Sequence, residues 1–179
     1  MIRAVERPTI NRQALSGVII AAIFGIGWAQ WGASGLTGAA AGVVRAVTAV
    51  LGAIILIRAF RLRRTAPGGS VSMFASRGYR IVVALEVVAI IAGAIVLNAT
   101  GHPGYVAAWI AAVVGVHFLG FGSLFARFYY VVGALIVLGA LAALVVGLAG
   151  SGRRAIEATA GLVTAAALLS AAGWRLARR

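Results

Sequence analysis

The sequence contains no cysteine, no lysine and no aspartate, and only 11% of its residues are charged. Without cysteine, the chain has no disulfide, no thiol nucleophile and no thiolate metal site. Soluble domains carry about 25% charged residues, so this low fraction argues against water as the main solvent. The mean hydropathy of +1.06 points the same way. Composition alone therefore predicts an integral membrane protein.

The charge that is present is almost all positive. The 16 basic residues are all arginines, the acidic residues number 3, and the formal net charge is +13. Such a balance often indicates nucleic-acid binding. Here the arginines stand at the ends of long apolar runs, as they do in membrane proteins, and we expect no nucleic-acid partner. The exclusive use of arginine is typical of GC-rich bacterial coding, so we assign the chain to a bacterial plasma (inner) membrane.

Six segments are long and apolar enough to cross a bilayer, which takes roughly 20 residues as a helix. They cover approximately 14–33, 38–58, 80–99, 105–126, 128–149 and 155–174. We predict an all-α, multi-pass membrane protein in which six transmembrane helices form a compact bundle over 14–174. The remainder is an N-terminal segment (1–13), a basic loop (about 59–79) and a basic tail (175–179). The start 1–35 also resembles a secretory signal, but the five later spans favour a retained helix.

The arginines predict the orientation. They gather in the N-terminal segment, in the connection between the second and third spans, and in the tail, so the positive-inside rule places both termini in the cytoplasm. Arg153 and Arg154 fall on the other side and break the rule. Four arginines in the long connection suit anionic lipid head groups: Arg58, Arg61, Arg63 and Arg64.

The two halves of the chain show a weak internal similarity. The segment 20–32 (IAAIFGIGWAQWG) aligns without gaps on 110–122 (IAAVVGVHFLGFG). Three helices in each half would place the halves upside down relative to each other, as in several transporter folds. Because small apolar residues dominate the chain, chance matches are common, so a 3+3 inverted-topology repeat is a hypothesis alongside the plain bundle.

Ionisable side chains inside the spans are few, and two of them are expected at a similar depth. With a rise of 1.5 Å per residue, Glu86 lies roughly 9 Å and His117 roughly 13 Å from the cytoplasmic end of their spans. The two spans are antiparallel and joined by a short turn. A carboxylate and an imidazole in contact stabilise each other's charged forms or share a proton, so we predict a proton- or cation-handling pair. Alternatively, each residue only holds helices together.

Other polar residues are assigned weaker roles. Arg45 is a further transport or ligand candidate, although its long side chain can also reach outward to the interface. Gln30, Asn98 and His102 are candidates for an outer vestibule. Glu157 is expected in the first turn of its helix, where a carboxylate interacts well with the helix dipole. Because no cluster has metal-ligand spacing, we expect no metal and no cofactor.

Three classes of function agree with this pattern. A small transporter or channel would use Glu86 and His117 to handle protons or cations. A non-catalytic membrane subunit or scaffold would use its polar residues only for helix packing. An intramembrane enzyme would use the pair as acid and base on a lipid-soluble substrate. The first class is preferred, because ionisable groups inside a membrane are functional by default. A homo-oligomer or a larger membrane complex stays open.

Overall fold

The computed structural model describes residues 11–68 and 73–178. Within them lie the α-helices α1 (Arg12–Ser34), α2 (Gly38–Thr65), α3 (Arg77–Ala99), α4 (Val106–Leu124), α5 (Phe128–Leu148) and α6 (Gly152–Ala177), with the short 3₁₀ turns η1 (Met73–Ala75) and η2 (Pro103–Tyr105). These 6 α-helices are each long and apolar enough to cross a membrane. The described residues contain no strand. The predicted all-α fold with six membrane-spanning helices is therefore confirmed.

Several helices extend further at their ends than the apolar runs predict. The helix α2 continues through the arginines to Thr65, because arginine is a good helix former and no breaker occurs before Pro67. Since α3 begins at Arg77, after a Ser76 side-chain cap, the loop expected over 59–79 is shorter than predicted. The helix α6 likewise runs on to Ala177, so it includes Arg175, which was assigned to the tail.

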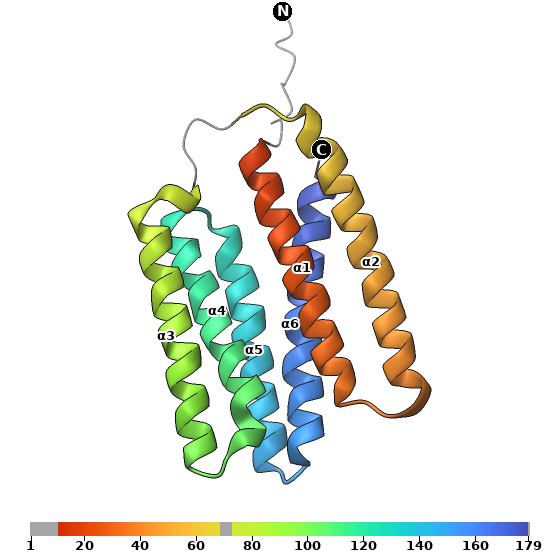
Figure 1. The fold of residues 1–179 in the computed structure, drawn as a ribbon, viewed down its shortest axis with the longest axis vertical. Helices are drawn as coiled ribbons and strands as arrows, with labels where there is room; N and C mark the ends of the chain where they lie inside the picture. The colour runs from red at the N-terminus through yellow and green to blue at the C-terminus, as the bar shows by residue number, and fades with distance from the viewer. Residues whose placement is uncertain (1–10, 69–72, 179) are drawn as a thin grey trace, which may run out of the picture.

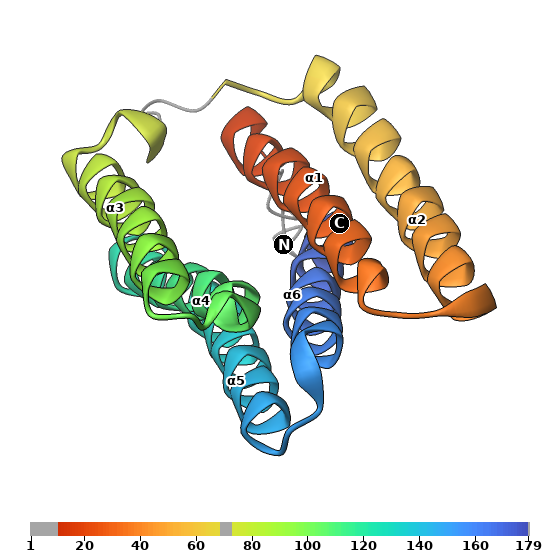
Figure 2. The ribbon, with the colours of Figure 1, turned by 60° about the horizontal axis from the view of Figure 1, so that its bottom comes forward.

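The helices form a curved row in the order α2, α1, α6, α5, α4, α3 (Figures 1 and 2). The start of α1, the end of α2, the start of α3 and the end of α6 lie at one end of the bundle (Figure 1). We call this the basic end, because it carries the arginines of those segments. Arg153 and Arg154, at the start of α6, lie at the opposite end.

Small residues allow the central helices to approach closely. A Cβ atom added at Gly32 of α1 would lie 2.8 Å from the backbone nitrogen of Leu162 in α6, and one at Gly161 would lie 2.5 Å from the Gly32 Cα. Between α4 and α5, a Cβ at Gly133 would lie 2.7 Å from the carbonyl oxygen of Gly115. Membrane helices associate through such close packing, because lipid supplies no hydrophobic drive between them.

The helices at the two ends of the row are the least buried. In α2 only 6% of the most apolar stretch is buried, and in α3 none of it is, compared with 56% in α6. Apolar faces left this open suit contact with lipid chains. The most apolar stretch of each helix holds at most 2 charged side chains, whereas a helix in water carries a polar and charged face.

The helix contacts are not symmetrical between the two halves of the chain. The pair α1–α2 packs as the pair α4–α5 does, but α5 also packs along α6, whereas no comparable packing joins α2 and α3 within the described residues. The inverted repeat therefore stays a hypothesis, and its two halves differ in how their last two helices meet.

Candidate functional site

A partly enclosed cavity of about 440 Å³ lies on the inner side of the helix row. One face of each of α1, α3, α4 and α6, together with the start of α5 and Phe74 of η1, forms its wall. In α3 the lining positions recur every three or four residues, from Tyr79 to Ile90, as one face of a helix does. The wall is mainly apolar. Its polar side chains are those of Trp28, Tyr79, Glu86, His117, Tyr129 and Arg175.

Glu86 and His117 meet in the wall of this cavity, at the similar depth that the sequence predicted. The Nδ1 atom of His117 and the Oε2 atom of Glu86 are 3.0 Å apart. The His117 side chain is 9% exposed and that of Glu86 18%. Although the contact is short, Nδ1 has no hydrogen-bond partner among the described residues. The two groups form an ion pair when the imidazole is protonated.

The register between α3 and α4 is fixed by a second contact across the same pair of helices. The indole Nε1 of Trp109 donates a hydrogen bond of 2.9 Å to the carbonyl oxygen of Ala89. Gly93 makes room for this ring, because a Cβ there would collide with the indole. Trp109 lies two turns before His117 on α4, and Ala89 lies almost one turn after Glu86 on α3. This contact therefore helps to set the two partners at one level.

Aromatic rings surround the imidazole. The ring of Phe121 lies 4.1 Å from that of His117 in an edge-on arrangement, and Phe118 lies 5.5 Å away. Phe121 in turn stacks on Tyr79 at 5.4 Å and contacts Tyr129 at 5.9 Å. Rings packed in this way exclude water, and in a medium of low dielectric constant the attraction between the carboxylate and a protonated imidazole is stronger than in water.

Arg175 lines the cavity near the basic end, and the sequence reasoning missed it. It was read as part of a solvated tail, because it follows the last apolar run. The structure places it in the last turn of α6, with its guanidinium 5.2 Å from the centre of the Phe128 ring. No ion pair joins Arg175 to any residue in the described ranges. Tyr79 and Tyr129 were missed as well, since nothing in their local sequence separates them from interface aromatics.

Three large side chains that line the cavity are also substantially exposed. They are Ile20 (41%) and Phe24 (59%) on α1 and Val87 (48%) on α3. Phe24 and Val87 lie near the middle of their helices, so this exposure occurs at membrane depth. Since α1 and α3 do not pack along each other, we call these three residues the rim of an opening between the two helices.

The remaining candidates from the sequence lie away from the cavity. Arg45 is exposed on α2. The Gln30 amide donates to the Thr48 hydroxyl at 3.5 Å, which joins α1 to α2. Asn98 donates to its own helix, at the carbonyl oxygen of Ala94, at 2.7 Å. His102 contacts Thr100 in the turn after α3. The structure brings none of these four to the Glu86–His117 pair.

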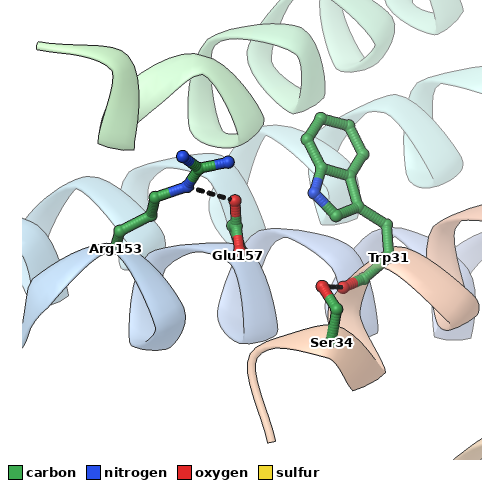
Figure 3. Close-up of polar contacts among 4 residues, drawn as sticks. All are labelled: Trp31, Ser34, Arg153 and Glu157. Atoms are coloured by element: carbon green, nitrogen blue, oxygen red, sulfur yellow. Dashed lines mark hydrogen bonds and ion pairs between the residues drawn. The ribbon is translucent and has the colours of Figure 1, made fainter.

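Glu157 has a different role from the one expected. Since α6 begins at Gly152, Glu157 lies in the second turn, and its Oε1 atom accepts a 2.7 Å hydrogen bond from Nε of Arg153. Figure 3 shows this ion pair on α6, with Trp31 and Ser34 on the neighbouring α1. The prediction of a first-turn carboxylate was wrong, because the turn before α6 is shorter than the sequence pattern suggested.

The chemistry available in the cavity is that of proton exchange and ion pairing. In the described part of the chain, no three His, Cys, Asp or Glu side chains come together in a way that would hold a metal ion.

No known family model matches the sequence, and neither a curated protein nor a solved structure is significantly similar to it.

Proposed function

We propose that the protein is a small membrane transporter or channel in which Glu86 and His117 together take up and release a proton or another cation. The observation that carries this proposal is their 3.0 Å contact in the wall of a cavity at membrane depth. Ionisable groups within a membrane span are energetically costly and typically mark ion pathways or proton relays. A scaffold role would instead be supported by two side chains buried separately in dry helix interfaces.

The pair suits this task because its net charge changes with the number of protons it holds. With one proton between them, the two side chains form either an ion pair or a neutral pair, and neither leaves a net charge in the membrane. A second proton, or the loss of the only one, creates a net charge that disfavours the state. Uptake of a proton therefore changes how strongly the cavity holds a charged ligand, which is the coupling that a transporter needs.

A second candidate function is an intramembrane enzyme that acts on a lipid-soluble substrate. The rim formed by Ile20, Phe24 and Val87 favours it, because an opening at membrane depth admits substrates from the bilayer. The distance of Gln30, Arg45 and Asn98 from the cavity also supports access from one side only. In that role Glu86 and His117 would act as acid and base.

We further propose that the chain lies in a bacterial plasma membrane with its basic end in the cytoplasm. The gathering of arginines at the ends of α1, α2 and α6 supports this orientation through the positive-inside rule. In this orientation Arg58, Arg61, Arg63 and Arg64 of α2 are placed to contact anionic lipid head groups.

Proton flux through reconstituted protein tests the transport function. The full chain is inserted into liposomes that contain a pH-sensitive dye, and a membrane potential is imposed with potassium and valinomycin. We expect a flux with the wild type that is lost in Glu86→Gln and in His117→Ala. Glu157→Gln is the matched control, because it removes the other carboxylate of the described residues, which lies away from the cavity. Its flux should equal that of the wild type.

The same experiment separates the alternatives. Exchange of the inner and outer cations for sodium shows whether a proton or a metal cation moves. Wild-type flux in both Glu86→Gln and His117→Ala would refute the role of the pair. An absence of flux from the wild type under every ion gradient would refute transport of these ions and leave the enzyme as the better proposal.

A further inference from the structure

We propose that the cavity binds a compact, lipid-soluble organic anion, which enters from the bilayer between α1 and α3 and places its negative group beside Arg175. The inference rests on the proposed function in one respect, that the cavity is the substrate site. It goes beyond that function by naming the chemical class of the substrate.

The rim determines the route of entry. Ile20, Phe24 and Val87 belong to the cavity wall and yet are 41%, 59% and 48% exposed. Phe24 and Val87 lie near the middle of helices that cross the membrane, so the medium they meet is hydrocarbon rather than water. A solute that reaches the cavity by this route has to dissolve in the bilayer first, which excludes small hydrophilic ions as the ligands that use it.

The charged side chains around the cavity determine the sign of the ligand's charge. Glu86 is matched by His117, so this pair adds no net charge when it holds one proton. Arg175 adds one positive charge, and the other carboxylate of the described residues, Glu157, is bound to Arg153 at the far end of the bundle. Phe128 lies against the guanidinium and shields part of it from water. A partly desolvated arginine that forms no ion pair with a described residue is a strong site for a carboxylate, a phenolate or a phosphate.

The volume of the cavity and the polar groups in its wall determine the size and shape of the ligand. A cavity of about 440 Å³ lies in the lower part of the range of roughly 300–1,000 Å³ that holds drug-sized ligands, so the occupant is one compact body and not a two-chain phospholipid. The Phe118 and Phe121 rings provide an apolar, aromatic surface for it. The Nδ1 atom of His117 makes no hydrogen bond to a described residue, so the imidazole offers a second polar contact to a ligand that carries a hydroxyl or a carbonyl group.

Two ions of the same shape and opposite charge test the inference. Tetraphenylborate and tetraphenylphosphonium are both lipid-soluble and nearly equal in size. Their binding to the full chain in detergent is measured by equilibrium dialysis, with equal micelle concentrations on both sides so that partition into micelles cancels. We expect the wild type to bind the borate at least tenfold more tightly than the phosphonium.

Arginine variants locate the source of this preference. Arg175→Gln should weaken borate binding about tenfold and leave phosphonium binding unchanged or stronger, whereas Arg175→Lys should keep the preference. Arg178→Gln is the matched control, because Arg178 belongs to the same end of α6 and also stacks on an aromatic ring, that of Trp174, but does not line the cavity. It should leave both affinities within twofold of the wild type.

Several results would overturn the inference. These are equal affinity for the two ions, tighter binding of the phosphonium, no binding of either, or an equal loss of borate affinity in Arg175→Gln and Arg178→Gln. A phospholipid that stays bound to the wild type but not to Arg175→Gln in native mass spectrometry would refute the claim that the ligand is compact. If Arg175→Gln does not fold, the comparison of the two ions on the wild type still decides the sign. Because dialysis involves no flux, failure here is distinguishable from failure of proton transport.

Discussion

The contact between Gly161 and Gly32 leads to a prediction whose magnitude follows from the structure. In Gly161→Ala, the new Cβ would lie 2.5 Å from the Gly32 Cα, 2.6 Å from the Gly32 nitrogen and 2.9 Å from the carbonyl oxygen of Trp28. All three are backbone atoms, so no side-chain rotation relieves the collision, and α1 has to move away from α6. Ordinary van der Waals contact of a Cβ begins at 3.4 Å, so the closest of these distances must grow by about 0.9 Å.

A second glycine of α6 isolates this cost. Alanine generally stabilises a helix relative to glycine by about 0.5–1 kcal/mol, a gain that both sites share. A Cβ at Gly173 meets nothing within 4 Å, so Gly173→Ala should be neutral or stabilising. Overpacking costs about 1–3 kcal/mol, and the two variants should therefore differ in free energy of unfolding by about that amount.

The free energy of unfolding is measured by titrating the protein in mixed micelles with sodium dodecyl sulfate and following the helical circular dichroism. We expect Gly161→Ala to unfold at a lower detergent fraction than the wild type, and Gly173→Ala at an equal or higher one. Equal midpoints for the two alanine variants would refute the reasoning, because the close approach of α1 and α6 would then carry no energetic weight.

Two further predictions concern polar contacts between and along helices. Trp109→Phe removes the hydrogen bond to the Ala89 carbonyl and should lower the free energy of unfolding by about 0.6–2 kcal/mol, the range for such bonds in membranes; in the same titration, a midpoint equal to the wild type would contradict it. Arg153→Gln leaves the 11% exposed carboxylate of Glu157 without its partner, so its cost should lie between the roughly 0.2–1 kcal/mol of exposed ion pairs and the 3–5 kcal/mol of buried ones. Arg154→Gln is the control, and the double variant Arg153→Gln/Glu157→Gln should recover most of the loss. A loss in the double variant as large as in Arg153→Gln would show that the carboxylate is not the cause.

Depth and neighbourhood along the chain were sufficient to predict that Glu86 and His117 lie at a similar level on adjacent helices, but not that the two side chains touch. A helix rises by a fixed amount per residue, and the short turn between α3 and α4 forces these helices to be antiparallel neighbours. Counting residues from the span ends therefore placed both side chains at a similar level. The helix faces could not be predicted with the same certainty, and here the hydrogen bond of Trp109 helps to set them.

The rest of the site could not be predicted because it depends on helices that are distant in sequence. Arg175 reaches the cavity only because α6 packs between α1 and α5, and apolar runs carry no information about which run packs against which. Its location within α6 was missed for a second reason. An arginine just after an apolar run looks the same whether the helix stops there or continues. The spacing of small residues along α6 was a weak signal for helix packing, since Gly161 lies on the face toward α1.

The carboxylate of the Glu86–His117 pair belongs to the helix that is held least firmly. No residue of α3 is buried, and within the described residues α4 is the one α-helix against which it packs extensively. Elements with few buried contacts move at the lowest cost in free energy. A swing of α3 away from α1 would widen the opening at Phe24 and Val87, and a displacement relative to α4 would separate the carboxylate from the imidazole. The position of α3 therefore affects two features together, the width of the opening at the rim and the distance between the Glu86 carboxylate and the His117 imidazole.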